Sequence, residues 1–130
     1  MSPAVSLSEN DLAQFFRVPV YLPVDYDGRE MLSTSRISNV SQNGVFIATT
    51  KPLPLGTEVE LRFQLPSVRE LIIVKGVVRW SRGSPKHEKP VPGRAIGMGV
   101  EFSKLPRAHR AHIKNFIGRF ITEMRGRKGQ

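Results

Sequence analysis

Short segments rich in Val, Ile, Phe and Thr recur every ten to fifteen residues between Val18 and Phe102. Residues of these types favour β-strands, and the Gly, Pro and Asn residues between the segments favour turns. The spacing therefore predicts six strands, at about 18–25, 30–40, 45–50, 58–65, 71–82 and 94–103. In a chain this short, such a run of strands folds as a small antiparallel barrel or sandwich.

Two dipeptides predict tight turns between the first three strands. Asp27-Gly28 and Asn43-Gly44 both tolerate positive φ, which two-residue hairpin loops require. The segment Ser81–Gly93 contains several Gly and Pro residues and predicts an exposed loop between the last two strands.

One amphipathic helix is predicted after the strands, over residues 106–124. Pro106 suits the first turn of a helix, and Gly126 is expected to end it within a basic tail, residues 125–130. The apolar residues of this segment recur at spacings of one and three, so they form one stripe that can cover an opening of the β-structure. They are Ile113, Phe116, Ile117, Phe120, Ile121 and Met124.

Residues 1–16 are expected to form an N-terminal segment ahead of a single domain, residues 17–124, whose β-structure covers residues 17–103. Ser8 followed by Asp11 resembles a capping box, which predicts either a short helix through Phe16 or a flexible segment. The segment contains no Lys or Arg and no apolar run, so we expect no secretory signal.

Composition excludes several classes of protein. No apolar run approaches the roughly 18 residues of a membrane-spanning helix. The absence of cysteine excludes disulfides, cysteine-ligated zinc and thiol catalysis, and a cytoplasmic location is expected. No catalytic arrangement stands out, so we expect no enzyme activity and no cofactor. His109 and His112 have a spacing compatible with two metal ligands, but no nearby carboxylate in the sequence completes a site, and no metal is expected.

The positive charge lies mainly near the C-terminus. The net charge is +9, and from Lys104 onward eight basic residues accompany one acid, Glu123. A basic face of this kind attracts an acidic protein, a phosphorylated ligand or nucleic acid, although a solvated helix face has the same appearance. The candidate partner-binding residues are Arg107, Arg110, Lys114 and Arg119.

The sharpest short pattern is Asn39-Val40-Ser41-Gln42-Asn43-Gly44. Asn39 and Ser41 are two apart in a predicted strand, so both side chains leave the same face of the sheet. A carboxamide beside a hydroxyl can hydrogen-bond the edge of a base or a phosphate oxygen. An ordinary hairpin with polar outer positions is the alternative.

These residues resemble the PilZ domain family, bacterial receptors for the second messenger cyclic di-GMP. The family's Asp/Asn-x-Ser-x-x-Gly motif is matched by Asn39, Ser41 and Gly44, and the resemblance covers about residues 12–122. It is especially similar to a branch of the family expanded in myxobacteria. Four further stretches carry the resemblance: Arg17-Val18-Pro19-Val20, Pro52-Leu53-Pro54-Leu55-Gly56, Gly76-Val77-Val78-Arg79-Trp80 and Gly97-Met98-Gly99-Val100-Glu101-Phe102.

The resemblance implies a six-stranded antiparallel barrel with a C-terminal helix and no catalysis. It also implies a ligand site made of Arg17, Asn39, Ser41 and Gly44. The family's second motif, Arg-x-x-x-Arg, is incomplete, because its second arginine corresponds to Arg17 and its first to Ala13. Arg36 is expected to face the other side of the sheet from Asn39, so it does not replace the missing arginine. Trp80 and the phenylalanines are expected to fill the barrel or anchor the helix, and the stacking of bases in a single-strand nucleic-acid binder is the alternative.

We therefore predict a stand-alone, non-enzymatic regulatory or adaptor protein in bacterial signalling. The resemblance implies control of motility, polarity or biofilm formation, with cyclic di-GMP binding weakened or lost because of Ala13. One alternative is a functional cyclic di-GMP receptor that uses Arg17, Asn39 and Ser41. A second alternative is a basic β-barrel that binds nucleic acid, but a protein partner is favoured.

Overall fold

The computed structural model describes residues 17–28, 31–82 and 96–128. The short helix expected around Ser8 and Asp11, position 13 of the second motif and the loop expected at Ser81–Gly93 lie wholly or largely outside these residues. Among the described residues, no helix has the length and apolar character needed to span a membrane.

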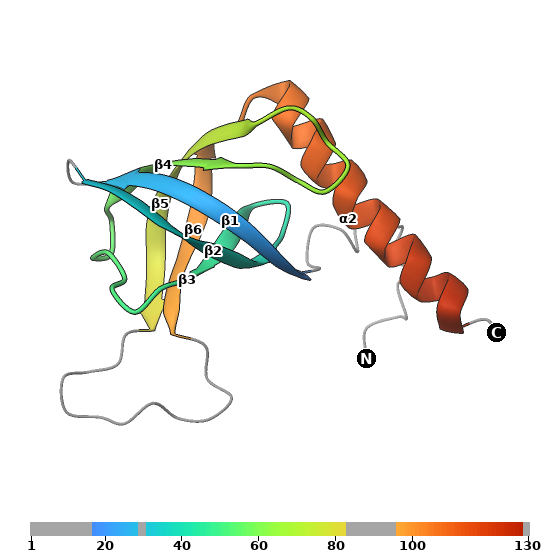
Figure 1. The fold of residues 1–130 in the computed structure, drawn as a ribbon, viewed down its shortest axis with the longest axis horizontal. Helices are drawn as coiled ribbons and strands as arrows, with labels where there is room; N and C mark the ends of the chain where they lie inside the picture. The colour runs from blue at the N-terminus through green and yellow to red at the C-terminus, as the bar shows by residue number, and fades with distance from the viewer. Residues whose placement is uncertain (1–16, 29–30, 83–95, 129–130) are drawn as a thin grey trace, which may run out of the picture.

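Six antiparallel strands close into a barrel, and one helix follows them (Figure 1). The order around the barrel is β1-β2-β3-β6-β5-β4. The strands are β1 (Val18–Gly28), β2 (Met31–Val40), β3 (Gly44–Ala48), β4 (Glu58–Phe63), β5 (Ile72–Arg82) and β6 (Gly97–Lys104). The predicted mainly β fold is confirmed, and of the two architectures open from the strand pattern the chain adopts the barrel.

Alternation of apolar and polar residues fills this barrel. In β4, Val59, Leu61 and Phe63 are buried, whereas Glu58 is exposed and Glu60 and Arg62 are partly so. The same period of two runs through the second half of β1, where Val24 and Tyr26 point inward. The barrel core is therefore built from the inward-facing residues of these strands, and the alternation of apolar and polar residues in the sequence already identified these residues.

The predicted turn at Asp27-Gly28 is wrong by two residues. β1 continues through both residues, and Gly28 pairs with Met31 of β2. The connection between the two strands therefore falls at residues 29–30, which lie outside the described residues. A dipeptide that favours turns can also lie within a strand when its residues pair with a neighbouring strand, as Asp27 and Gly28 pair with Leu32 and Met31.

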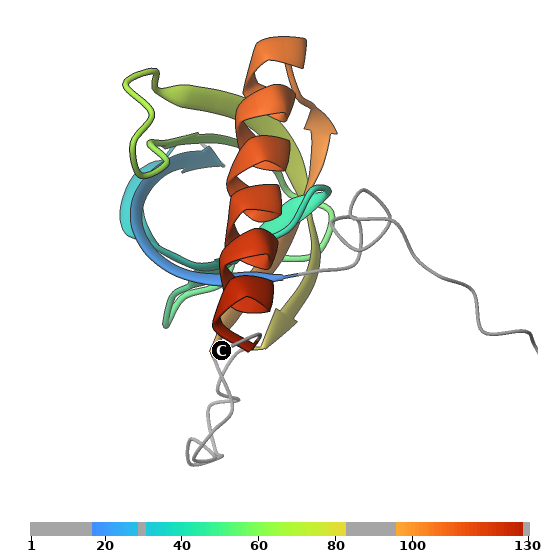
Figure 2. The same cartoon turned by 90° about the vertical axis from the view of Figure 1, so that its right-hand side faces the viewer.

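The helix α2 (Arg107–Lys128) lies across one end of the barrel (Figure 2). Ile113, Ile117 and Ile121 are almost fully buried and belong to the barrel core, and Phe116 and Phe120 pack against it. The predicted apolar stripe is confirmed as the face that covers the barrel.

Gly126 does not end the helix as predicted, because α2 continues through it to Lys128. A glycine inside a helix costs about 1 kcal/mol relative to alanine, which one residue near the end of a long packed helix can tolerate. The residues expected to form a basic tail therefore begin as a continuation of the helix.

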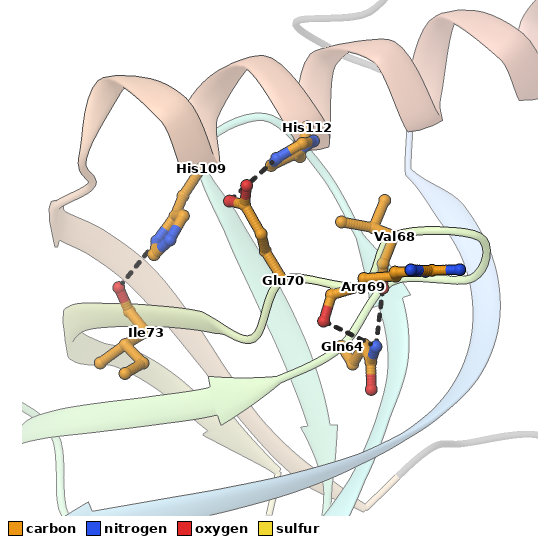
Figure 3. Close-up of polar contacts among 7 residues, drawn as sticks. All are labelled: Gln64, Val68, Arg69, Glu70, Ile73, His109 and His112. Atoms are coloured by element: carbon orange, nitrogen blue, oxygen red, sulfur yellow. Dashed lines mark hydrogen bonds and ion pairs between the residues drawn. The ribbon is translucent and has the colours of Figure 1, made fainter.

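Two histidines in the first half of α2 contact the start of β5 and the β4–β5 connection (Figure 3). His109 Nδ1 lies 3.2 Å from the carbonyl oxygen of Ile73, and His112 Nε2 lies 3.3 Å from Glu70 Oε2. Gln64 stiffens the connection by donating from Nε2 to the carbonyl oxygens of Val68 and Arg69, at 2.7 and 3.1 Å. The two histidines thus contact separate partners, and no group of three potential metal ligands occurs among the described residues.

Candidate functional site

A hollow of about 160 Å³ lies on the outer side of the barrel wall. It brings together all four residues of the predicted ligand site: Arg17, Asn39, Ser41 and Gly44. The remaining residues that line it are Asn43, Val45, Phe46, Arg79, Trp80, Gly99, Val100 and Glu101. Residues far apart in the sequence therefore meet on one surface, because β3, β6 and β5 are neighbours in the barrel.

Two stacked aromatic rings line this hollow. Phe46 and Trp80 have ring centroids 5.1 Å apart and an interplanar angle of 16°. Val45 and Ile47, on either side of Phe46, belong to the core, so Phe46 points outward from β3. Phe46 is nevertheless only 2% exposed, whereas Trp80 is partly buried and lies outside the barrel core, so the prediction that Trp80 fills the barrel is wrong.

Glycines of β6 make room for these rings. A Cβ atom added at Gly97 would lie 2.7 Å from Phe46 Cζ, and one added at Gly99 would lie 2.7 Å from Trp80 Cδ1. Real Cβ atoms do not approach other atoms so closely. The aromatic rings therefore rest directly on the backbone of β6, which gives the hollow a flat apolar wall.

Ser41 and Gly44 close the turn that follows β2. The backbone N–H and the Oγ hydroxyl of Ser41 both donate to the carbonyl oxygen of Gly44, at 2.9 and 3.1 Å. Ser41 and Asn39 are only partly buried, and both line the hollow. The predicted outward platform of one carboxamide and one hydroxyl is thus present, and the hydroxyl is oriented by the turn.

The role of Gly44 differs from the one expected. Positive φ was predicted at Asn43-Gly44, but among the described residues positive φ occurs at Ser67 and Gly56 instead. A Cβ atom at Gly44 would collide with the backbone carbonyl of Val100 on the neighbouring strand β6. Glycine is needed here because two backbones approach closely, not because the turn requires an unusual φ.

Arg17 stands beside the aromatic wall. Its side chain is exposed, and its Cζ atom lies 6.0 Å from the centroid of the Trp80 ring. At this distance the cation is attracted to the face of the ring.

Arg79 and Glu101 also line the hollow, and sequence reasoning missed both. Arg79 Nε lies 3.7 Å from Glu101 Oε2, and the two side chains are 58% and 56% exposed. The register of β5 against β6 shifts between Val78 and Trp80, which marks a β-bulge. Strict alternation would place adjacent residues on opposite faces, whereas the bulge lets both Arg79 and Trp80 reach the hollow.

A second bulge changes the position of Arg36. The register of β2 against β3 shifts between Ile37 and Asn39, and both Ile37 and Val40 are fully buried. Arg36 and Asn39 therefore both face outward, so the prediction that they face opposite sides is wrong. Arg36 nevertheless does not line the hollow, and its Cζ atom lies 5.0 Å from the centroid of the exposed Tyr21 ring.

The four predicted partner-binding residues are all exposed, but they do not share one side of α2. Arg107 and Lys114 are separated by about two helical turns and lie on the same side. Arg110 and Arg119 are separated by about two and a half turns and lie on opposite sides. Arg119 lines a different hollow between α2 and the β4–β5 connection, together with Arg69 and His112.

The chemistry of the outer hollow suits a planar anionic ligand. The lining of the hollow includes two guanidinium groups, those of Arg17 and Arg79, and one carboxylate, that of Glu101. Trp80 offers a surface on which a base can stack, and Asn39 and Ser41 supply neutral hydrogen-bonding groups. These groups combine charge, stacking and hydrogen bonding in one place.

The chain matches the PilZ domain family over residues 11–119. No curated protein matches it.

Two solved structures share the fold. The inhibitor of motility MotI/DgrA from Bacillus subtilis superposes with a TM-score of 0.67 at 21% identity, over 82% of this chain and 49% of that chain. The PilZ domain of CeSA from a cellulose synthesizing bacterium superposes with a TM-score of 0.54 at 16% identity, over 78% of this chain and 94% of that chain. This chain thus spans about half the length of MotI/DgrA. Since the family match covers most of the chain, including β1 to β6 and α2 as far as Arg119, this protein belongs to the PilZ domain family.

Proposed function

We propose that this protein is a non-enzymatic regulatory module whose outer hollow binds cyclic di-GMP with reduced affinity. One observation carries the proposal: Arg17, Asn39, Ser41 and Gly44, at the family's motif positions, line one hollow beside Trp80. Membership of the PilZ domain family supports a regulatory role related to cyclic di-GMP, and it gives no support to catalysis.

Each group in the hollow has a defined task in this proposal. Arg17 donates to a phosphate or to the acceptor atoms of a guanine, and Trp80 stacks on a base. Asn39 and Ser41 hydrogen-bond the nucleotide. Gly44 allows β3 to approach β6, which places these side chains around one ligand.

Ala13 is the reason for expecting reduced affinity. A hydrogen bond between charged groups contributes about 1.5–3 kcal/mol. Loss of one such contact weakens binding by about ten- to a hundredfold. Arg79 adds a second positive charge to the hollow from β5, and this supports residual binding over complete loss.

Calorimetric titration of cyclic di-GMP into the purified protein tests the proposal. We expect saturable binding that weakens at least tenfold in Asn39→Ala. Asn115→Ala is the matched control, because Asn115 is exposed on α2 and does not line the hollow. A flat titration of the unmodified protein at millimolar ligand would refute the proposal.

We further propose that the module acts on an acidic protein partner through the side of α2 that carries Arg107 and Lys114. Both are exposed on one side of the helix, and no acid lies between them in the sequence. A cytoplasmic location is part of this proposal. Of the processes that the family implies, we favour motility control, because the structural neighbour MotI/DgrA is named an inhibitor of motility.

The geometry of α2 supplies a matched pair of variants for this surface. Lys114→Glu and Arg119→Glu change the charge equally, but Lys114 lies on the side of Arg107 and Arg119 does not. Recovery of an acidic partner by affinity capture should fall much more in Lys114→Glu. Equal losses in both variants would place the contact elsewhere.

A further inference from the structure

We infer that Arg79 and Glu101 together read guanine and reject adenine at the edge of the outer hollow. This inference rests on the proposed function, because it assigns base selectivity to the same nucleotide site. It adds Arg79 and Glu101, which lie outside the two ligand motifs but within the stretches 76–80 and 97–102 that carry the family resemblance.

The pair is placed where a base stacked on Trp80 would present its edge. Arg79 precedes Trp80 in β5, and Glu101 lies in β6, two residues after Gly99, on which the Trp80 ring rests. Both side chains line the hollow. A donor group and an acceptor group are thus held side by side next to a stacking surface.

The contact between the two side chains is loose enough for a ligand to replace it. Their nearest charged atoms are 3.7 Å apart, and both side chains are more than half exposed. Exposed ion pairs of this kind contribute little to stability. The two groups can therefore turn toward a ligand at little cost.

The order of donor and acceptor fits guanine. Guanine presents the acceptors O6 and N7, which an arginine fork contacts, and beside them the donors N1–H and N2–H₂. A carboxylate accepts from those two donors. Adenine presents a donor, N6–H₂, where guanine has O6, and an acceptor at N1, so the same pair meets it with unfavourable contacts on both sides.

Base selectivity can be separated from simple charge effects. Glu101 repels phosphate groups, so its removal is expected to raise the affinity for any anionic dinucleotide. Cyclic di-GMP and cyclic di-AMP carry the same phosphate charges. A change in the charge of the protein should alter both dissociation constants by the same factor. The ratio of the two constants therefore measures base selectivity alone.

The experiment measures both dissociation constants by calorimetry for the unmodified protein, Arg79→Ala and Glu101→Ala. We expect the unmodified protein to prefer cyclic di-GMP and each variant to lose about five- to 150-fold of that preference, the range that one good bidentate base contact supplies. Lys75→Ala and Glu58→Ala are the controls, since both residues are exposed on β5 and β4 and neither lines the hollow.

The outcomes distinguish this inference from the proposed function. If both variants keep the full preference for cyclic di-GMP, or if the unmodified protein shows no preference, the inference is wrong while the proposed function stands. If the unmodified protein binds neither nucleotide at millimolar concentration, both are wrong. Circular dichroism of each variant checks that the barrel remains folded.

Discussion

Gly97 and Gly99 determine the shape of the outer hollow although neither has a side chain. A Cβ atom at Gly99 would collide with the Trp80 ring, and one at Gly97 would collide with the backbone carbonyl of Ile47 and with the Phe46 ring. In the sequence the two glycines resemble flexible positions within a strand, whereas in the barrel they form a surface on which aromatic rings lie. The side chains of the candidate site therefore depend on residues that have no side chains of their own.

Gly99→Ala is expected to push the Trp80 indole away from β6. The added methyl group would displace ring atoms, break the stack with Phe46 and destabilise the fold by about 1–3 kcal/mol, as overpacking generally does. Urea denaturation and the emission spectrum of Trp80, the single tryptophan of the chain, measure the two effects.

Gly118→Ala is the control for this variant. Gly118 lies in α2, and apart from its chain neighbours and the backbone of the helix no atom lies within 4 Å of the position that its Cβ would take. Alanine there should raise stability by about 0.5–1 kcal/mol, because it is the better helix former. Equal stabilities of Gly99→Ala and the unmodified protein would show that the wall is not tightly packed.

The strands and the helix can be predicted from periodic patterns in the sequence, whereas the β-bulges that interrupt the strands cannot. Leu61 and Phe63 in β4, or Ile113 and Ile117 in α2, identify buried faces because polar residues occur at the intervening positions. The bulges near Ser38 and Arg79 each add one residue to a strand, and no local residue type marks them. Sequence reasoning therefore found the elements but misplaced Arg36 and missed Arg79.

Ile117→Ala tests the contribution of α2 to the barrel. Ile117 is fully buried where the helix covers the barrel end, so its truncation should destabilise the protein by about 2–5 kcal/mol. Chemical denaturation measures the loss. Asn115→Ala, an exposed position two residues away, should change the stability by less than about 0.5 kcal/mol. A comparable, small effect of both variants would mean that the helix is not part of the core.

Two surfaces of the folded protein are separate. The outer hollow is lined by strand and turn residues, and none of the residues that line it comes from α2. The basic side of the helix with Arg107 and Lys114 therefore remains exposed when the hollow is filled. Such an arrangement suits a module that holds a small ligand on one surface and a protein on another.

The family motifs of the sequence predicted only some of the residues that line the candidate site. Asn39 and Ser41 flank the buried Val40 at the end of β2 and leave the same face, as their two-residue spacing predicted. Trp80, Arg79 and Glu101 join them only because β5 and β6 lie beside β3 in the closed barrel. Strand order depends on contacts between distant segments, which the pattern of a single sequence does not contain.

Ala13→Arg should strengthen cyclic di-GMP binding. The change restores the arginine that the family motif has four residues before Arg17, and one charge-assisted contact supplies about ten- to a hundredfold in affinity. Calorimetry measures the dissociation constant. Ala13→Lys is the control, because lysine restores the charge without the planar fork and should regain less. No gain in either variant would mean that the missing arginine does not limit binding.

Tryptophan fluorescence provides the sharpest test of the proposed nucleotide site, because Trp80 lines the hollow and is the single tryptophan of the chain. Titration with cyclic di-GMP should change the Trp80 emission to a saturating value, and Arg17→Ala should require at least tenfold more ligand for the same change. An emission that stays constant while calorimetry reports saturation would place the ligand elsewhere and contradict the assignment of this hollow.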